Sequence, residues 1–110
     1  MNISLDFDGT YTEDNEAWNS FIDTFLNNGH QVYLVTMRYP HEANRAIKDL
    51  SKKIPVIFTE RQAKKAFVEN VVKIHTWKDE TKEWITEENG SIQINVWIDD
   101  NPHWIYTDSI

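Results

Sequence analysis

Apolar side chains recur at helical spacing in the first third of the chain. Thr12 or Asp14 can cap the start of a helix there, and Gly29 suits the left-handed residue that ends one. Between residues 15 and 28, positions i, i+3, i+4, i+7 and i+8 are apolar, which predicts one face of an amphipathic helix. These positions are Trp18, Phe21, Ile22, Phe25 and Leu26.

Two further helices are predicted downstream. Pro40 suits the first position of a helix, and the buried side of that helix carries Ala43, Ala46, Ile47 and Leu50. Thr59 and Gln62 form a capping-box pattern for the next helix. The inward side of this third helix carries Phe67, Val68, Val71 and Val72.

Four segments have the composition of β-strands. Residues 3–7, 32–35 and 54–58 are short apolar runs of the kind found in buried strands. Pro55 removes a backbone donor, which favours a strand start or a sheet edge for the third run. Residues 92–98 alternate with a period of two and form the fourth predicted strand.

Strands and helices therefore alternate along the chain, and residues 73–90 are the least regular part. Within them, 79–88 are expected to form a helix that docks Trp84 and Ile85, or a loop with one helical turn. Such alternation is typical of an α/β domain with right-handed crossovers. We predict one domain over residues 1–110, a Rossmann-like three-layer α/β/α fold with a mainly parallel sheet and no cap domain.

Composition restricts the classes of function. With 40% hydrophobic and 13% aromatic residues, the 110-residue chain can build a core, and the absence of cysteine excludes disulfides and thiolate metal sites. A net charge of −7 disfavours binding to anionic membrane surfaces. It also makes nucleic-acid binding less favourable, although it does not exclude it. No apolar run approaches the roughly 18 residues of a membrane span. The first residues lack a signal-peptide pattern, so we expect a cytoplasmic protein.

Polar residues gather where the predicted strands end. Asp6 and Asp8 follow the first strand, Thr36 follows the second, and Asp99 and Asp100 follow the last. In a parallel sheet the carboxyl ends of the strands meet at one crevice. Four carboxylates there would repel one another without a cation, and such hard oxygen ligands favour Mg²⁺ or Ca²⁺. This arrangement suits phosphoryl transfer, in which positioning and charge stabilisation supply the catalysis.

These motifs resemble those of the haloacid dehalogenase superfamily. The resemblance rests on the sequence DFDGT at residues 6–10, on Thr36, on a lysine at a helix start and on Asp99-Asp100, in the superfamily's order. It covers residues 2–104. Dehalogenases of the superfamily lack the acid/base residue at the place of Asp8, so the resemblance implies a phosphatase. The chain is expected to be a Mg²⁺-dependent phosphomonoester hydrolase.

The resemblance also implies a role for each site residue. Asp6 would attack phosphorus and form an aspartyl-phosphate, and Asp8 would act as general acid and then as general base. Thr36 would bind the transferring phosphoryl group. Mg²⁺ would be held by the Asp6 carboxylate, the Asp8 backbone carbonyl and one or both of Asp99 and Asp100.

The basic residues of the site are assigned from spacing. Lys64 lies on the inward face of the third predicted helix, whereas Lys65 shares that face only in part, so Lys64 is expected in the site with Lys65 as the alternative. Arg38 follows Thr36 by two residues. It could bind a substrate phosphate or carboxylate, or form a surface ion pair.

The gaps after the first two strands predict the kind of partner. Residues 11–14 and 37–39 are too short to hold the cap domain that commonly shields this kind of site. Relatives without a cap tend to act on large substrates or to use a neighbouring subunit as a lid. The sequence is therefore compatible with a substrate that is a phosphorylated small molecule or the phosphorylated end of a macromolecule. It is also compatible with a homo-oligomer.

Three other interpretations compete with a phosphatase. Acidic loops are often solvated turns. A receiver domain of phosphorelay signalling also combines acids, a threonine and a lysine, but its phosphorylated aspartate follows the third strand, where this chain has Glu60. A non-catalytic module could keep the pocket to bind phosphate, metal or another protein, and it would bind metal without releasing phosphate.

Overall fold

The computed structural model describes residues 1–70 and 72–109. Its β-strands form one sheet in the order β5-β4-β3-β2-β1-β6. β1, β2, β3 and β6 run parallel to one another, and β4 and β5 form an antiparallel hairpin whose strand β4 pairs antiparallel with β3. The strand bounds are β1 Asn2–Leu5, β2 Gln31–Thr36, β3 Val56–Phe58, β4 Val72–Lys78, β5 Glu83–Asn89 and β6 Val96–Ile98.

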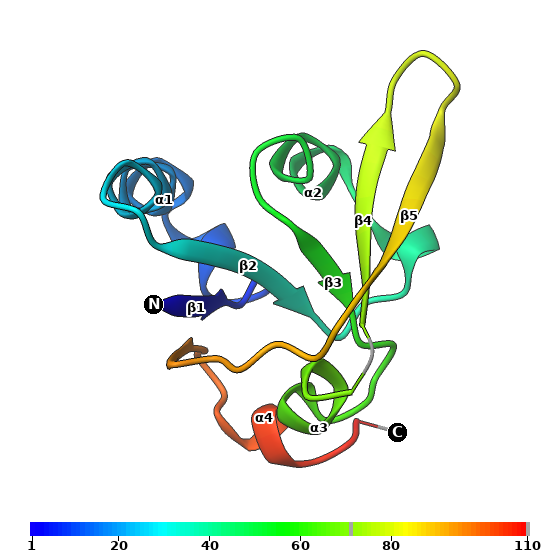
Figure 1. The fold of residues 1–110 in the computed structure, drawn as a ribbon. Coiled ribbons are helices and arrows are strands. Elements are labelled where there is room, and N and C mark those ends of the chain that lie inside the picture. The colour runs from blue at the N-terminus through cyan, green and yellow to red at the C-terminus, as the bar shows by residue number, and fades with distance from the viewer. Residues whose placement is uncertain (71, 110) are drawn as a thin grey trace.

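The helices lie on opposite sides of this sheet (Figure 1). α1 and α2 lie on one side, and the shorter α3 and α4 lie on the other. Short 3₁₀ turns, η1 and η2, follow β1 and β2. The helix bounds are α1 Asn15–Asn27, α2 Arg45–Leu50, α3 Lys64–Val68 and α4 His103–Tyr106, with η1 at Tyr11–Glu13 and η2 at Pro40–Glu42.

This α+β architecture shows that the Rossmann-like three-layer α/β/α fold predicted from the sequence was wrong. The sheet is mixed, because β4 and β5 run antiparallel. On the side opposite α1 and α2, the described chain supplies only five residues of α3, four of α4 and the irregular segment 90–95. A third layer of crossover helices is therefore not formed.

The segment 72–89 accounts for most of the difference. The helix predicted for 79–88 is instead the hairpin turn and strand β5. Trp77 and Trp84 face each other across the hairpin with ring centroids 5.3 Å apart, and Lys82 takes a left-handed φ of 53° in the turn. Cross-strand aromatic pairs stabilise antiparallel strands, so the tryptophan predicted to dock a helix stabilises a hairpin instead.

Other element boundaries also differ. Pro40 begins only η2, and α2 starts five residues later, where the Asn44 side chain accepts a hydrogen bond from the Ile47 amide at 3.0 Å. The strand predicted for 92–98 is confined to β6. Of the inward residues predicted for the third helix, Val68 ends α3, Val72 begins β4 and Val71 lies outside the described residues.

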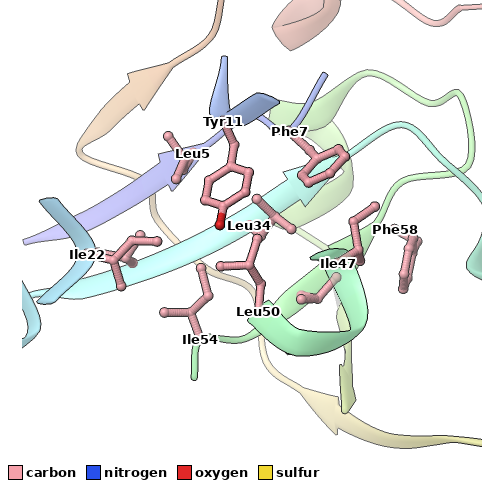
Figure 2. Close-up of a cluster of buried hydrophobic side chains, with 11 residues drawn as sticks. Leu5, Phe7, Tyr11, Ile22, Leu34, Ile47, Leu50, Ile54 and Phe58 are labelled. Atoms are coloured by element: carbon pink, nitrogen blue, oxygen red, sulfur yellow. The ribbon is translucent and has the colours of Figure 1, made fainter. Parts of the chain in front are cut away.

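Two apolar clusters hold the sheet between its flanking segments. The larger joins β1, β2 and β3 to α1 and α2, and Figure 2 shows its side chains meeting. Ile22 from α1 and Ile47 from α2 are both fully buried there. The smaller cluster, on the other face, joins the sheet to α3 and segment 90–95: Val35, Ile57, Val68, Val72 and Ile92. The strand ends are thus fixed by packing on both faces.

Across the described residues, no helix combines the length and the hydrophobicity needed to cross a membrane.

Candidate active site

A cleft of about 250 Å³ opens at the carboxyl ends of the parallel strands. The ends of β1, β2 and β6 and the start of α3 each contribute polar side chains to it. Six of the residues predicted for the site line this cleft together: Asp6, Asp8, Thr36, Lys64, Asp99 and Asp100.

The turn after β1 requires a glycine. Gly9 has a φ of +80°, and a Cβ built on it would lie 2.2 Å from Asp100 Oδ2. Any larger residue would collide with that carboxylate and would also strain the backbone. Gly9 therefore allows the loop after β1 to approach the acidic pair that follows β6.

Lys64 joins two carboxylates at the base of the cleft. Its Nζ donates hydrogen bonds to Asp6 Oδ1 at 2.7 Å and to Asp99 Oδ2 at 2.6 Å. The three side chains are only 3%, 9% and 4% exposed, respectively. A buried charge needs an oppositely charged partner, and this ammonium is the partner of both carboxylates. Asp6 follows β1 and Asp99 follows β6, so the lysine links the two ends of the sequence.

The Asp6 carboxylate has a perturbed pKa. The pKa is raised from 3.8 to about 7, mainly by burial, while the adjacent Lys64 ammonium lowers it and a hydrogen bond with Asp100 raises it. The Thr10 hydroxyl lies 3.2 Å from Asp6 Oδ2 and accepts a hydrogen bond from the Asp100 amide at 3.1 Å. Asp6 is thus held on both of its oxygens.

The acidic side chains fit a divalent cation. One carboxylate oxygen from each of Asp6, Asp99 and Asp100 lies within 4.8 Å of the others. Three carboxylates and the Lys64 ammonium carry a net charge of −2 when all are ionised. Oxygen donors of this kind are the ligands that Mg²⁺ and Ca²⁺ prefer. The donor type, the spacing and the charge therefore suit a hard divalent cation.

Asp8 is held differently from the other acids. Arg38 binds both of its oxygens, with Nη2 2.7 Å from Oδ1 and Nε 3.0 Å from Oδ2. The Arg38 Nη1 also donates to the carbonyl of Glu42 at 2.7 Å. The Asp8 side chain is 57% exposed at the rim, and a metal-binding role for its backbone carbonyl stays a prediction.

The structure separates the two lysines considered for the site. Lys64 is buried in the cleft, whereas Lys65 is 44% exposed and forms an i,i+4 ion pair with Glu69. Arg38 does not line the cleft but contacts it through Asp8.

Thr36 lies at the end of β2 with 1% of its surface exposed. Its hydroxyl oxygen accepts a hydrogen bond from the Arg38 amide at 3.3 Å. The hydroxyl hydrogen can therefore be donated into the cleft, toward an anionic group.

Sequence reasoning missed Arg61 and Trp104, which also line the cleft. Arg61 donates from Nη1 to the Met37 carbonyl at 2.7 Å and from Nη2 to Glu42 at 2.8 Å. Its φ of 70° is uncommon for an arginine. No local pattern signals that conformation, so spacing alone could not have placed this guanidinium beside the acids.

Comparison with protein-family models, with curated proteins and with solved structures finds no match to this chain. The geometry and chemistry of the cleft are therefore the basis for assigning a function.

Proposed function

We propose that this protein is a Mg²⁺-dependent phosphatase that forms an aspartyl-phosphate on Asp6, as the haloacid dehalogenase-like motifs imply. The observation that carries the proposal is the buried ion-paired chain from Asp6 through Lys64 to Asp99, at distances of 2.7 and 2.6 Å. A carboxylate held in this way is oriented as a nucleophile, and its charge is balanced without loss of access to the cleft. The substrate would be a phosphorylated small molecule or the phosphorylated end of a macromolecule.

In the first step, an Asp6 oxygen attacks phosphorus and the bond from phosphorus to the ester oxygen breaks. Asp8, in its protonated form, gives its proton to the departing oxygen. The Thr36 hydroxyl donates a hydrogen bond to the transferring group, and Lys64 balances charge beside the nucleophile.

In the second step, Asp8 takes a proton from a water molecule as that water attacks phosphorus. The bond from phosphorus to Asp6 breaks, which releases inorganic phosphate and restores both carboxyl groups. Asp8 must leave Arg38, at least in part, because Arg38 binds both of its oxygens.

Asp6, Asp99 and Asp100 would hold the cation. When bound, Mg²⁺ supplies positive charge that neutralises the phosphoryl oxygens and the clustered carboxylates.

Hydrolysis of p-nitrophenyl phosphate tests the proposal. Activity should require Mg²⁺, be abolished by EDTA and be lost in Asp6→Asn, which keeps the side-chain shape but removes the nucleophile. Asp8→Asn should retain Mg²⁺ binding and lose about 10²-fold or more in kcat. Full activity in Asp6→Asn would refute the mechanism.

A second candidate is a module that binds metal or phosphate without turnover. The bidentate pairing of Asp8 with Arg38 favours it, because that contact occupies the residue needed as acid and base. Beryllofluoride, which mimics a phosphoryl group on an aspartate, distinguishes the two. Trapping on Asp6 together with phosphate release supports the phosphatase, whereas Mg²⁺ binding with no release supports the module.

A further inference from the structure

The chain that follows β6 returns to the loop that precedes α3. Residues 107–109, here called the C-terminal segment, make two hydrogen bonds to that loop. The Ala63 amide donates to Asp108 Oδ1 at 2.7 Å, and the Ser109 amide donates to the Arg61 carbonyl at 2.6 Å. The segment therefore contacts the loop on both sides of Gln62.

The local hydrogen bonds of the loop join Thr59 and Gln62, at 3.0 and 2.9 Å, whereas the Ala63 amide is bound by the distant Asp108. Glu60 and Arg61 both have left-handed φ values, 54° and 70°, which residues other than glycine seldom adopt. The N-cap residue of α3 is Ala63, whose methyl side chain cannot accept a hydrogen bond. Asp108 supplies an acceptor at this helix start from 45 positions along the chain.

The same contact bears on the lysine of the cleft. Ala63 directly precedes Lys64, so the Asp108 carboxylate holds the backbone from which the Lys64 side chain extends. At its other end, Lys64 binds Asp99 at 2.6 Å. Asp99 and Asp108 flank α4, which packs against α3. The start of α3 is thus joined to the chain around α4 by two polar contacts. Lys64 binds Asp99 before α4, and the Ala63 amide binds Asp108 after it.

We propose that Asp108 is a positioning residue that keeps the Lys64 ammonium between Asp6 and Asp99. This inference rests on the proposed function in so far as Lys64 serves the catalytic site. Asp108 acts through the Ala63 amide, so the feature required of it is an acceptor oxygen and not its negative charge.

Chemical labelling of lysine tests the inference without any need for activity. The chain is treated with an amine-reactive anhydride, and the rate at Lys64 is compared by mass spectrometry with the rate at exposed Lys65. In Asp108→Ala, labelling of Lys64 should accelerate about fivefold, the change in local opening expected when one capping hydrogen bond is lost. Asp108→Asn keeps an acceptor oxygen and should label within about twofold of the unchanged chain.

A matched control separates positioning from stability. Asp14 caps α1 by accepting from the Ala17 amide at 3.1 Å, and α1 carries none of the proposed site residues. Asp14→Ala should lower overall stability to a similar degree and leave Lys64 labelling and kcat unchanged. Ser109→Pro, which removes the second tether, should accelerate labelling in the same direction as Asp108→Ala.

Activity toward p-nitrophenyl phosphate gives a second readout. Asp108→Ala should lower kcat with little change in KM, because the Lys64 ammonium is less firmly held between Asp6 and Asp99, and Asp108→Asn should restore kcat. The inference is overturned if Lys64 stays protected in Asp108→Ala, or if Asp108→Asn labels as fast as Asp108→Ala. If the unchanged chain releases no phosphate, the proposed function fails, and labelling still decides the role of Asp108.

Discussion

Replacement of Lys64 by methionine removes one charge from the base of the cleft and keeps most of the side-chain volume. The change leaves Asp6 and Asp99 without the ammonium that both contact, at 2.7 and 2.6 Å. Both carboxylates are less than a tenth exposed, so water can replace the lost partner only in part. We expect the variant to fold with a clear loss of stability.

The size of this loss follows from the burial. Removal of one partner from a buried ion pair typically costs about 3–5 kcal/mol. The Asp6 carboxyl, whose pKa is already about 7, can take up a proton and relieve part of the repulsion. We therefore expect a loss of about 3 kcal/mol in the free energy of unfolding at pH 7.5, and a smaller loss at pH 5.5, where Asp6 is protonated in the unchanged chain.

Urea unfolding in EDTA measures the loss directly, and Lys65→Met is the matched control. Lys65 is exposed and pairs with Glu69 at the surface, so its replacement should change stability by no more than about 0.5 kcal/mol. Mg²⁺ should restore more stability to Lys64→Met than to the unchanged chain, because the variant site is more negative. Equal stabilities for the two variants at pH 7.5 would show that the buried ammonium does not hold the site together.

Three further perturbations test other parts of the molecule. Because the folded-state pKa of Asp6 is about 7 against 3.8 unfolded, the Asp6 contribution to the unfolding free energy of the metal-free protein should fall by about 3 kcal/mol as pH rises from 4 to 7. Urea unfolding of Asp6→Asn should lack this contribution, and an identical slope would contradict it. Gly9→Ala should abolish Mg²⁺ binding, measured by calorimetry, because the new Cβ would collide with Asp100. Gly29→Ala is the control: Gly29 has a similar φ of +83° but open space around it, so this variant should keep Mg²⁺ binding and lose only about 1 kcal/mol in the free energy of unfolding. Burial lowers the pKa of His75, so this side chain should contribute a loss of stability as pH drops below 6.5, opposite in sign to the Asp6 contribution. Thermal unfolding of His75→Phe should lack this loss relative to the unchanged chain, and the same pH dependence in both would assign it to other groups.

The parts of the fold that the sequence predicted well are those in which local pattern and tertiary packing agree. The stripe from Trp18 to Leu26 is α1, and Asp14, one of the two caps predicted for it, is the residue that caps it. β1 and β2 are apolar runs that are buried on both faces. Helical periodicity and continuous burial are properties of neighbouring residues, so a single sequence contains them.

The hairpin could not be predicted with the same success because its stability is not local. Trp84 and Ile85 are adjacent, which fits either a helix or a strand, and the strand is favoured by cross-strand contacts of Trp84 with Trp77 and with His75. Such pairings depend on which strand lies opposite. The same limit applies to Arg61, whose position in the cleft depends on left-handed backbone that no spacing rule predicts.

The cleft links folding to cation binding. Asp6, Asp99 and Asp100 bring three carboxylate oxygens within 4.8 Å, and only Lys64 among the four residues at the base is positive. The apolar clusters on the two faces of the sheet stabilise the strands that carry these acids, so hydrophobic burial offsets the repulsion between them. A cation that binds the folded acids and not the unfolded chain must raise the free energy of unfolding. The residual negative charge at the site thus lowers the stability of the fold alone, and a bound cation would offset that loss.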